Sequence, residues 1–234
     1  MTGARLILWD IDHTLIATRG VGREIFGDAF EQATRRPMER MAEVSGRTEP
    51  DIFQATLALH GTEPSDRLFA RFAQALATGY AARVDVLRQR GHALPGAAAA
   101  LEALHAIPGV IQSVLTGNLK PVAITKLAAF GLDAHLDFEV GAYGSDDPVR
   151  SNLVDIARQR AAKKYQVALD EMTTVLIGDT PSDVATARQG GAAVIAVASG
   201  RSDTAALRAA GAEIILEDLT NTAALVKAAT GDGS

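Results

Sequence analysis

From residue 101 onward, short apolar segments alternate with segments whose apolar residues recur at helical spacing. The apolar segments predict strands over 110–115, 138–140, 174–177, 193–197 and 213–216. The segments between and after them predict helices over 101–105, 121–130, 152–164, 182–189, 204–210 and 222–229. Repeated strand and helix units are typical of a parallel sheet covered on both faces, so the expected fold class is α/β with a doubly wound sheet.

Two carboxylates follow the first apolar stretch of the chain. Residues 6–8 form a short buried strand pattern, and the run WDIDHTL then places Asp10 and Asp12 two residues apart. In an open α/β sheet, ligands bind at the carboxyl ends of the strands. Crowded carboxylates must be solvated, protonated or neutralised by a cation. The pair therefore predicts a site for a metal ion or a proton.

The segment between this run and the alternating region is helical in pattern. Residues 22–89 are rich in Ala, Leu, Phe, Arg and Glu, and turn-forming residues near 45, 61 and 64 divide them into about four helices. We therefore expect a core formed by residues 1–16 and 92–234, with residues 17–91 inserted as a helical cap. The last four residues are expected to fray.

Composition excludes several classes of function. The chain has no cysteine, which excludes disulfides, thiol nucleophiles and thiolate metal sites and fits a cytoplasmic location. A net charge of -5 with dispersed basic residues argues against a nucleic-acid surface. No apolar stretch approaches the roughly 20 residues of a membrane span, and the first residues do not resemble a secretory signal. We expect a soluble protein with a small-molecule partner.

Polar residues also follow the strand predicted at 110–115. Thr116, Gly117 and Asn118 offer a hydroxyl and free backbone N–H groups to an anion just before a helix. The same residues are ordinary in a capped turn between a strand and a helix. Both interpretations stay open from this segment alone.

A second acidic pair follows the strand predicted at 174–177. Gly178 permits close backbone approach, Asp179 lies at the strand tip, and Asp183 comes one turn later in a helix, where an acid also serves as a cap. Together with Asp10 and Asp12, these acids place four carboxylates at one edge of the sheet. Such a set of oxygen ligands suits Mg²⁺.

An anionic substrate also requires basic side chains. Arg150, just before the helix predicted at 152–164, is the preferred candidate for binding phosphoryl oxygens through its guanidinium fork, with Lys120 as the alternative. In the helical insert, Arg47 lies at a turn that opens a helix and is a candidate for gripping a substrate carboxylate or second phosphate. Exposure on the surface is the ordinary alternative for each of them.

In this order, the motifs resemble those of haloacid dehalogenase (HAD) superfamily phosphatases of the phosphoglycolate phosphatase-like group. The first motif is matched by Asp10, Asp12, Thr14 and Leu15, the second by Thr116, Gly117 and Asn118, and the fourth by Gly178, Asp179 and Asp183. The resemblance spans nearly the whole chain, implies a Rossmann-like core, and likens the insert to the C1 cap of that family.

Two positions depart from the pattern of this family. His13 stands where the family usually has glycine in a tight turn, and histidine tolerates a positive φ better than most residues. The Lys-Pro signature of the third motif is missing, and Asp147 and Pro148 lie near its place.

The resemblance implies a mechanism for this chain. Asp10 would attack phosphorus to form an aspartyl-phosphate, and Asp12 would act as general acid and then general base. Mg²⁺ would be held by the Asp10 carboxylate, the Asp12 backbone carbonyl and Asp179, with Asp183 orienting a metal-bound water or another ligand. Thr116 and Gly117 would hold the phosphoryl oxygens.

The expected activity is hydrolysis of a small, phosphoglycolate-like phosphate ester. Asp12 favours a phosphatase over a dehalogenase, because an ester oxygen needs a proton donor and a halide does not. The alternatives are a phosphomutase of the β-phosphoglucomutase type and, with less support, a non-catalytic phospho-acceptor module for signalling. The sequence is compatible with a monomer or a homodimer.

Overall fold

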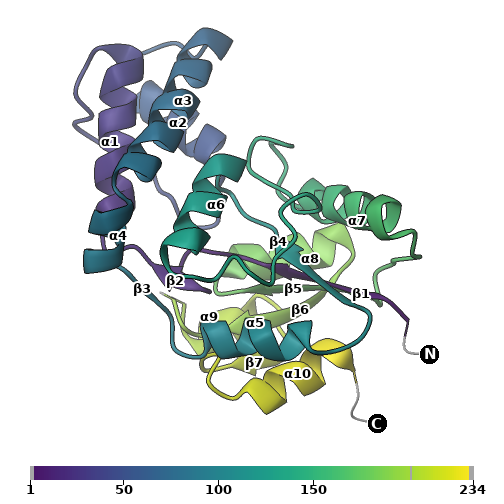
Figure 1. Cartoon of the computed structure of the whole chain (residues 1–234). Helices are drawn as coiled ribbons and strands as arrows, with labels where there is room; N and C mark the ends of the chain where they lie inside the picture. Colours follow the sequence, from purple (N-terminus) through teal and green to yellow (C-terminus); the bar gives the residue numbers. More distant parts are fainter. Residues whose placement is uncertain (1–2, 201, 232–234) are drawn as a thin grey trace.

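The computed structural model describes residues 3–200 and 202–231. A five-stranded sheet lies between two layers of helices, and a group of four helices lies at one end of the molecule (Figure 1). Of the last four residues, Gly231 ends the final helix, and 232–234 lie outside the described residues. Among the described residues, no helix has the length and apolar character needed to cross a membrane.

The sheet confirms the predicted α/β fold with parallel strands. Its strands, in spatial order, are β4 (Val110–Val114), β1 (Arg5–Trp9), β5 (Thr174–Gly178), β6 (Ala193–Val197) and β7 (Ile214–Leu216). All neighbouring pairs are parallel, and Trp9 at the end of β1 aligns with Val114 on one side and Ile177 on the other. The carboxyl ends of three strands therefore meet beside residue 10.

The strand predicted over 138–140 is wrong. These residues form turns, because the Asp137 side chain accepts a hydrogen bond from the Glu139 N–H and its carbonyl accepts one from Val140. Only an isolated bridge between Leu115 and Ala142 continues the sheet at this edge of the described structure. A three-residue apolar pattern is too short to distinguish a strand from a turn.

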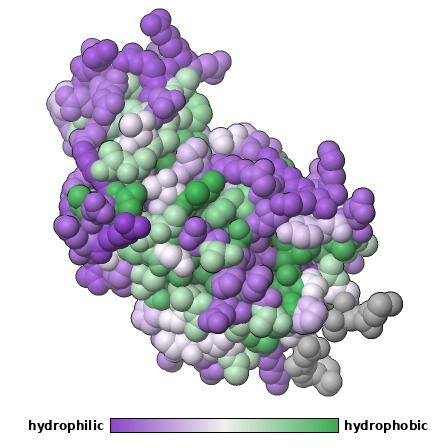
Figure 2. Space-filling view, viewed as in Figure 1, coloured by the Kyte–Doolittle hydropathy of each residue, from purple (hydrophilic) through white to green (hydrophobic). Residues whose placement is uncertain are grey.

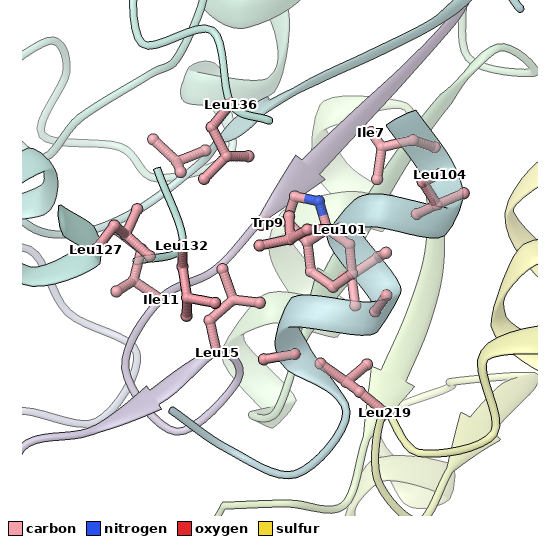
Figure 3. Close-up of a cluster of buried hydrophobic side chains, with 14 of the residues drawn as sticks. Ile7, Trp9, Ile11, Leu15, Leu101, Leu104, Leu127, Leu132, Leu136 and Leu219 are labelled. Atoms are coloured by element: carbon pink, nitrogen blue, oxygen red, sulfur yellow. The ribbon is translucent and has the colours of Figure 1, made fainter. Parts of the chain in front are cut away.

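Alternating side chains of β1 pack on both faces of the sheet. Ile7 and Trp9 join a cluster with α5 (Ala97–His105) and α10 (Thr222–Thr230), whereas Leu6 and Leu8 pack with α7 (Asn152–Tyr165) and α8 (Pro181–Gly190). α9 (Thr204–Ala209) packs beside α8. Figure 3 shows Trp9 against Leu101 of α5. Because side chains of β1 are buried on both faces of the sheet, the position of this strand is fixed. The position of Asp10, which follows it, is fixed as well.

The inserted helices are α1 (Val21–Thr34), α2 (Glu49–Leu59), α3 (Asp66–Ala82) and α4 (Val84–Arg90). They share an aromatic cluster in which the Phe53 and Phe72 rings stack with centroids 4.1 Å apart. α6 (Lys120–Ala129), which follows β4, adds Val122 and Ala129 to this cluster, and its N-cap residue Leu119 also joins it. The outer surface of the insert is mainly hydrophilic in Figure 2. The insert therefore packs on α6.

Both connections to the insert pass through a small second sheet. β2 (Ile16–Ala17) pairs antiparallel with β3 (His92–Ala93), so the chain enters and leaves the insert side by side. This strand pair was not predicted from the sequence, because two residues are too few to show an alternating pattern.

Candidate active site

Three acids meet at the carboxyl edge of the sheet. Asp10 follows β1, Asp179 follows β5, and Asp183 lies in the first turn of α8. Each offers a carboxylate oxygen, and these oxygens all lie within 4.8 Å of one another. All three residues are buried, with exposed fractions of 7%, 1% and 0%. The structure thus brings together three of the four acids expected to converge.

Local geometry around α8 explains how Asp183 enters this group. The Thr180 hydroxyl accepts a hydrogen bond from the Asp183 N–H (3.1 Å), and Asp183 Oδ2 accepts one from the Thr180 N–H (2.9 Å). This reciprocal pair is a capping box. Gly178 is required beside it, because a Cβ there would collide with the Asp183 carboxylate. One carboxylate oxygen therefore caps the helix while Oδ1 faces the other acids.

Arg150 neutralises part of this charge. Its Nη2 lies 3.0 Å from Asp10 Oδ1 and 2.6 Å from Asp183 Oδ1, and the guanidinium is buried. The second contact is an ion pair without the alignment of a hydrogen bond. Lys120, the alternative cation, instead pairs with Glu139 (2.6 Å) on the surface. The structure therefore places Arg150, and not Lys120, beside the acids.

The acids carry more negative charge than Arg150 offsets. Burial raises the pKa of Asp10 well above its ordinary value, and repulsion from Asp183 adds to this despite the attraction of Arg150. Burial, followed by repulsion from Asp183, raises the pKa of Asp179 to about 7. Asp183 Oδ1 has no hydrogen-bond partner among the described residues. Three buried carboxylates with this excess charge fit a hard divalent cation.

The raised pKa values predict that metal-free stability falls as pH rises. A carboxyl whose folded pKa exceeds its unfolded value stabilises the fold while protonated, and for Asp179 that stability is lost between pH ~4 and about 7. Between pH 5.5 and 8, the free energy of unfolding in EDTA should fall by up to about 1.4 kcal/mol per pH unit for each proton involved.

Thermal or urea unfolding across this pH range measures the effect. Mg²⁺ should flatten the profile, because it replaces the protons, and Asp179→Asn should remove part of the slope. A metal-free stability that stays constant or rises from pH 5.5 to 8 would contradict the excess charge of the site.

The carboxylate of Asp12 has a different environment. Lys126 Nζ lies 2.7 and 2.9 Å from its two oxygens, and Asn118 Nδ2 donates to Oδ2 at 2.9 Å. Burial acts to raise the pKa of Asp12, but Lys126 and these hydrogen bonds outweigh it and lower the pKa. Lys126 also donates to Asn118 Oδ1 (2.6 Å) and lies over the Tyr80 ring. Asp12 is therefore held as an ionised carboxylate.

Lys126 was not among the site residues predicted from the sequence. It lies on α6 and is only 4% exposed, on the same face as the apolar residues Val122, Ala123 and Leu127. A lysine within the apolar face of an amphipathic helix needs a buried acidic partner, and this pattern was the available signal.

The second motif forms the wall next to Asp12. The buried Thr116 hydroxyl accepts hydrogen bonds from the Asn118 N–H (3.2 Å) and Nδ2 (2.7 Å), which leaves its own proton free for an anion. A Cβ at Gly117 would collide with the Arg47 carbonyl of the insert, and the Gly117 carbonyl accepts the Glu49 N–H at 2.8 Å. The core loop and the insert therefore touch through backbone.

A chamber of about 560 Å³ lies between the insert and this edge of the sheet. Its lining contains every predicted site residue: Asp10, Asp12, Arg47, Thr116, Gly117, Asn118, Arg150, Asp179 and Asp183. Arg47 is paired with Asp51 through Nε (2.6 Å) and Nη2 (2.8 Å), and the Asn118 amide is occupied by Asp12 and Lys126. The roles of these residues in substrate binding stay predictions.

Fold and site together define an α/β protein with a helical insert and an acidic centre after its first strand. A family model described as haloacid dehalogenase-like hydrolase matches residues 7–188. The chain belongs to this family, which confirms the resemblance seen in its motifs. A comparison with curated proteins gives no significant match.

Solved structures share the fold over almost the whole chain. A hydrolase from Pseudomonas syringae is 22% identical, with a TM-score of 0.67 and coverage of 98% of this chain and 100% of the other. A predicted phosphoglycolate phosphatase from Haemophilus somnus 129PT is 18% identical, with a TM-score of 0.64 and coverage of 97% and 99%. CbbY from Rhodobacter sphaeroides, solved with phosphate, is 17% identical, with a TM-score of 0.67 and coverage of 95% and 99%.

Proposed function

We propose that this hydrolase is a Mg²⁺-dependent phosphatase that cleaves a small phosphate ester, such as phosphoglycolate, through an aspartyl-phosphate at Asp10. One observation carries the proposal: the candidate catalytic, phosphate-binding and metal-binding residues from three motifs line one chamber beneath the insert. The fold shared with CbbY in complex with phosphate and with a predicted phosphoglycolate phosphatase also supports it. Residues 17–91 then act as a cap that shields the chamber from water.

The chemistry uses the two carboxylates in turn. An oxygen of Asp10 attacks phosphorus, the bond to the ester oxygen breaks, and that oxygen takes a proton from Asp12. Asp12 then accepts a proton from water as the water oxygen attacks phosphorus and releases Asp10. Because Lys126 lowers the pKa of Asp12, Asp12 has to gain a proton before the first step and is ready as a base for the second.

The surrounding groups bind and orient the phosphoryl group. The Thr116 hydroxyl and the Gly117 N–H would donate to its oxygens, and Arg150 would hold the Asp10 carboxylate, to which it already donates a hydrogen bond. Asp10, Asp179, Asp183 and the backbone carbonyl of Asp12 would hold Mg²⁺. When bound, the ion offsets the repulsion between an anionic nucleophile and an anionic substrate.

A phosphate-release screen over small phosphate esters, with Mg²⁺ or EDTA, tests this proposal. Release that requires Mg²⁺ and is selective for a few esters is the expected result. Isomerisation of a sugar phosphate with little free phosphate would show a mutase instead. Failure to turn over any ester would favour the non-catalytic phospho-acceptor.

Asp12→Asn should separate substrates by their leaving groups. The amide cannot donate the proton that an alkoxide needs, so kcat/KM for an alkyl phosphate should fall by about 10²- to 10⁴-fold. An aryl phosphate leaves as a stabilised phenolate and should lose far less. The test compares the losses in kcat/KM for the alkyl phosphate and the aryl phosphate, measured on the same preparation. Equal losses for both substrates would contradict the role of Asp12 as the acid.

A further inference from the structure

Glu49 is a buried acid of the insert that the proposed chemistry does not use. It is the first residue of α2, lines the chamber and is 8% exposed. Among the described residues it forms no ion pair. Burial raises its pKa to about 7, and the attraction of Lys126 offsets only part of this effect. A carboxyl group in such a place is unfavourable unless its hydrogen bonds serve the structure around it.

Two hydrogen bonds join Glu49 to the loop of residues 116–119, which follows β4 in the core. The Glu49 N–H donates to the Gly117 carbonyl (2.8 Å), and Glu49 Oε2 accepts the Leu119 N–H (2.7 Å). The two contacted residues lie on either side of Asn118, whose amide binds Asp12. The insert therefore holds this core loop at two points through one residue.

The start of α6 has no cap of its own. Its N-cap residue is Leu119, which offers no side-chain hydrogen bond, and its third helical residue is Val122. In a capping box, an acid at that third position accepts the N–H of the N-cap residue, which valine cannot do. Glu49 supplies this acceptor from the insert. The first turn of α6 is therefore completed by a residue from another part of the chain.

The 116–119 loop also lies tightly between the insert and the segment before α7. A Cβ at Gly117 would collide with the Arg47 carbonyl, and a Cβ at Gly144 would collide with the Gly117 carbonyl. The Gly144 N–H donates to the Asn118 carbonyl (3.0 Å), while the Asn118 side chain donates to Asp12 (2.9 Å). A displacement of the loop would therefore also displace a partner of Asp12.

We propose that Glu49 is a positioning residue, which fixes the 116–119 loop from the insert for binding of the phosphoryl group. The Thr116 hydroxyl and the Gly117 N–H belong to this loop, so docking of the insert completes the site as well as covering it. Glu49 acts through Leu119 and Gly117 and touches no reacting atom. This inference deepens the proposed phosphatase function and rests on it.

Glu49→Gln and Glu49→Asp separate the reach of this side chain from its charge. Glutamine has the same length and an oxygen that accepts the Leu119 N–H, but no charge. Aspartate keeps the charge at the start of α2 and is one methylene too short. Exchange of the Leu119 amide hydrogen, measured by NMR on protein labelled with ¹⁵N-leucine, reports the contact directly. It should be at least about tenfold faster in Glu49→Asp and close to the wild-type rate in Glu49→Gln.

Two controls accompany the exchange measurement. The amide of Leu225, which lies in α10 and packs in the cluster with α5, should exchange at the same rate in all variants. Asp85→Ala removes another acid from the first turn of an insert helix, and its carboxylate is 90% exposed. This substitution should leave the exchange of Leu119 unchanged.

Turnover of an aryl phosphate in Mg²⁺ shows whether the contact serves catalysis. In Glu49→Asp, kcat should fall by about tenfold with little change in KM, because the loop would bind the phosphoryl group most tightly in the transition state. Glu49→Gln and Asp85→Ala should stay close to the wild type. A purely structural effect of the charge on α2 predicts the opposite order, with Glu49→Gln impaired and Glu49→Asp normal.

Unchanged exchange of Leu119 in Glu49→Asp, or equal acceleration in both variants, would overturn the inference. Faster exchange with a wild-type kcat in Glu49→Asp would overturn the positioning role and leave the phosphatase function standing. If the wild type hydrolyses no ester, the phosphatase function and the positioning role fail together. The exchange rates would then still show whether Glu49 holds the loop.

Discussion

Replacing Asp10 with asparagine should abolish phosphate release, with a loss of at least about a thousandfold in kcat. An amide keeps the shape of the side chain but does not attack phosphorus, so the proposed intermediate cannot form. The same substitution should preserve the fold and raise the melting temperature at pH 8 in EDTA. The reason is that it removes a buried charge whose pKa burial and Asp183 raise well above its ordinary value.

Phosphate release and thermal unfolding, measured on one preparation, test both parts of this prediction. Wild-type release by Asp10→Asn would exclude Asp10 as the nucleophile. A lower melting temperature at pH 8 in EDTA would show instead that the ion pair with Arg150 outweighs the crowding of the acids. The exposed control Glu63→Gln should change neither quantity.

Arg150→Met should have the largest effect on stability. It leaves Asp10 and Asp183 without the one cation that contacts them in the described structure, and breaking a buried pair in this way costs about 3–5 kcal/mol. The loss should be greatest at pH 8 in EDTA. It should shrink at pH 5.5, where Asp179 is protonated and Asp10, with its raised pKa, is closer to protonation. Urea unfolding at the two pH values, with and without Mg²⁺, measures it.

Arg158→Met provides a control of similar chemistry. Arg158 lies on α7 and bonds to the Thr174 hydroxyl and the carbonyls of Gly190 and Gly191, away from the acids. The loss in the free energy of unfolding caused by Arg158→Met should depend little on Mg²⁺ or on pH between 5.5 and 8. If Arg150→Met behaves in the same way as Arg158→Met, the role of Arg150 in neutralising the acids is wrong.

Most of the fold could be predicted from the sequence because its elements have strong periodic patterns. The strand at 193–197 was predicted with the bounds that the structure gives, and the other core strands differ by one residue at one or both ends. The predicted strand at 138–140 and the missed pair β2 and β3 are short segments with two or three residues each. In such segments tertiary contacts, and not periodicity, decide the conformation.

The candidate site was predictable as a set of residue types but not as a set of partners. Motif spacing indicated that Asp10, Asp179 and Asp183 would meet, since adjacent parallel strands end together. It did not indicate that Lys126 would reach Asp12 from α6, or that Arg47 would pair with Asp51 inside the insert. Such pairings depend on side-chain direction and on how the insert packs against α6.

Trapping the covalent intermediate tests the central claim most directly. Borohydride reduces an aspartyl-phosphate to homoserine, so enzyme quenched during turnover of an aryl phosphate and then reduced can be sequenced by mass spectrometry. Homoserine at position 10, formed only with substrate and enriched in Asp12→Asn, is the predicted result, because that variant lacks the base for the second step. Phosphate release without modification of residue 10, or homoserine at Asp179 instead, would contradict the account.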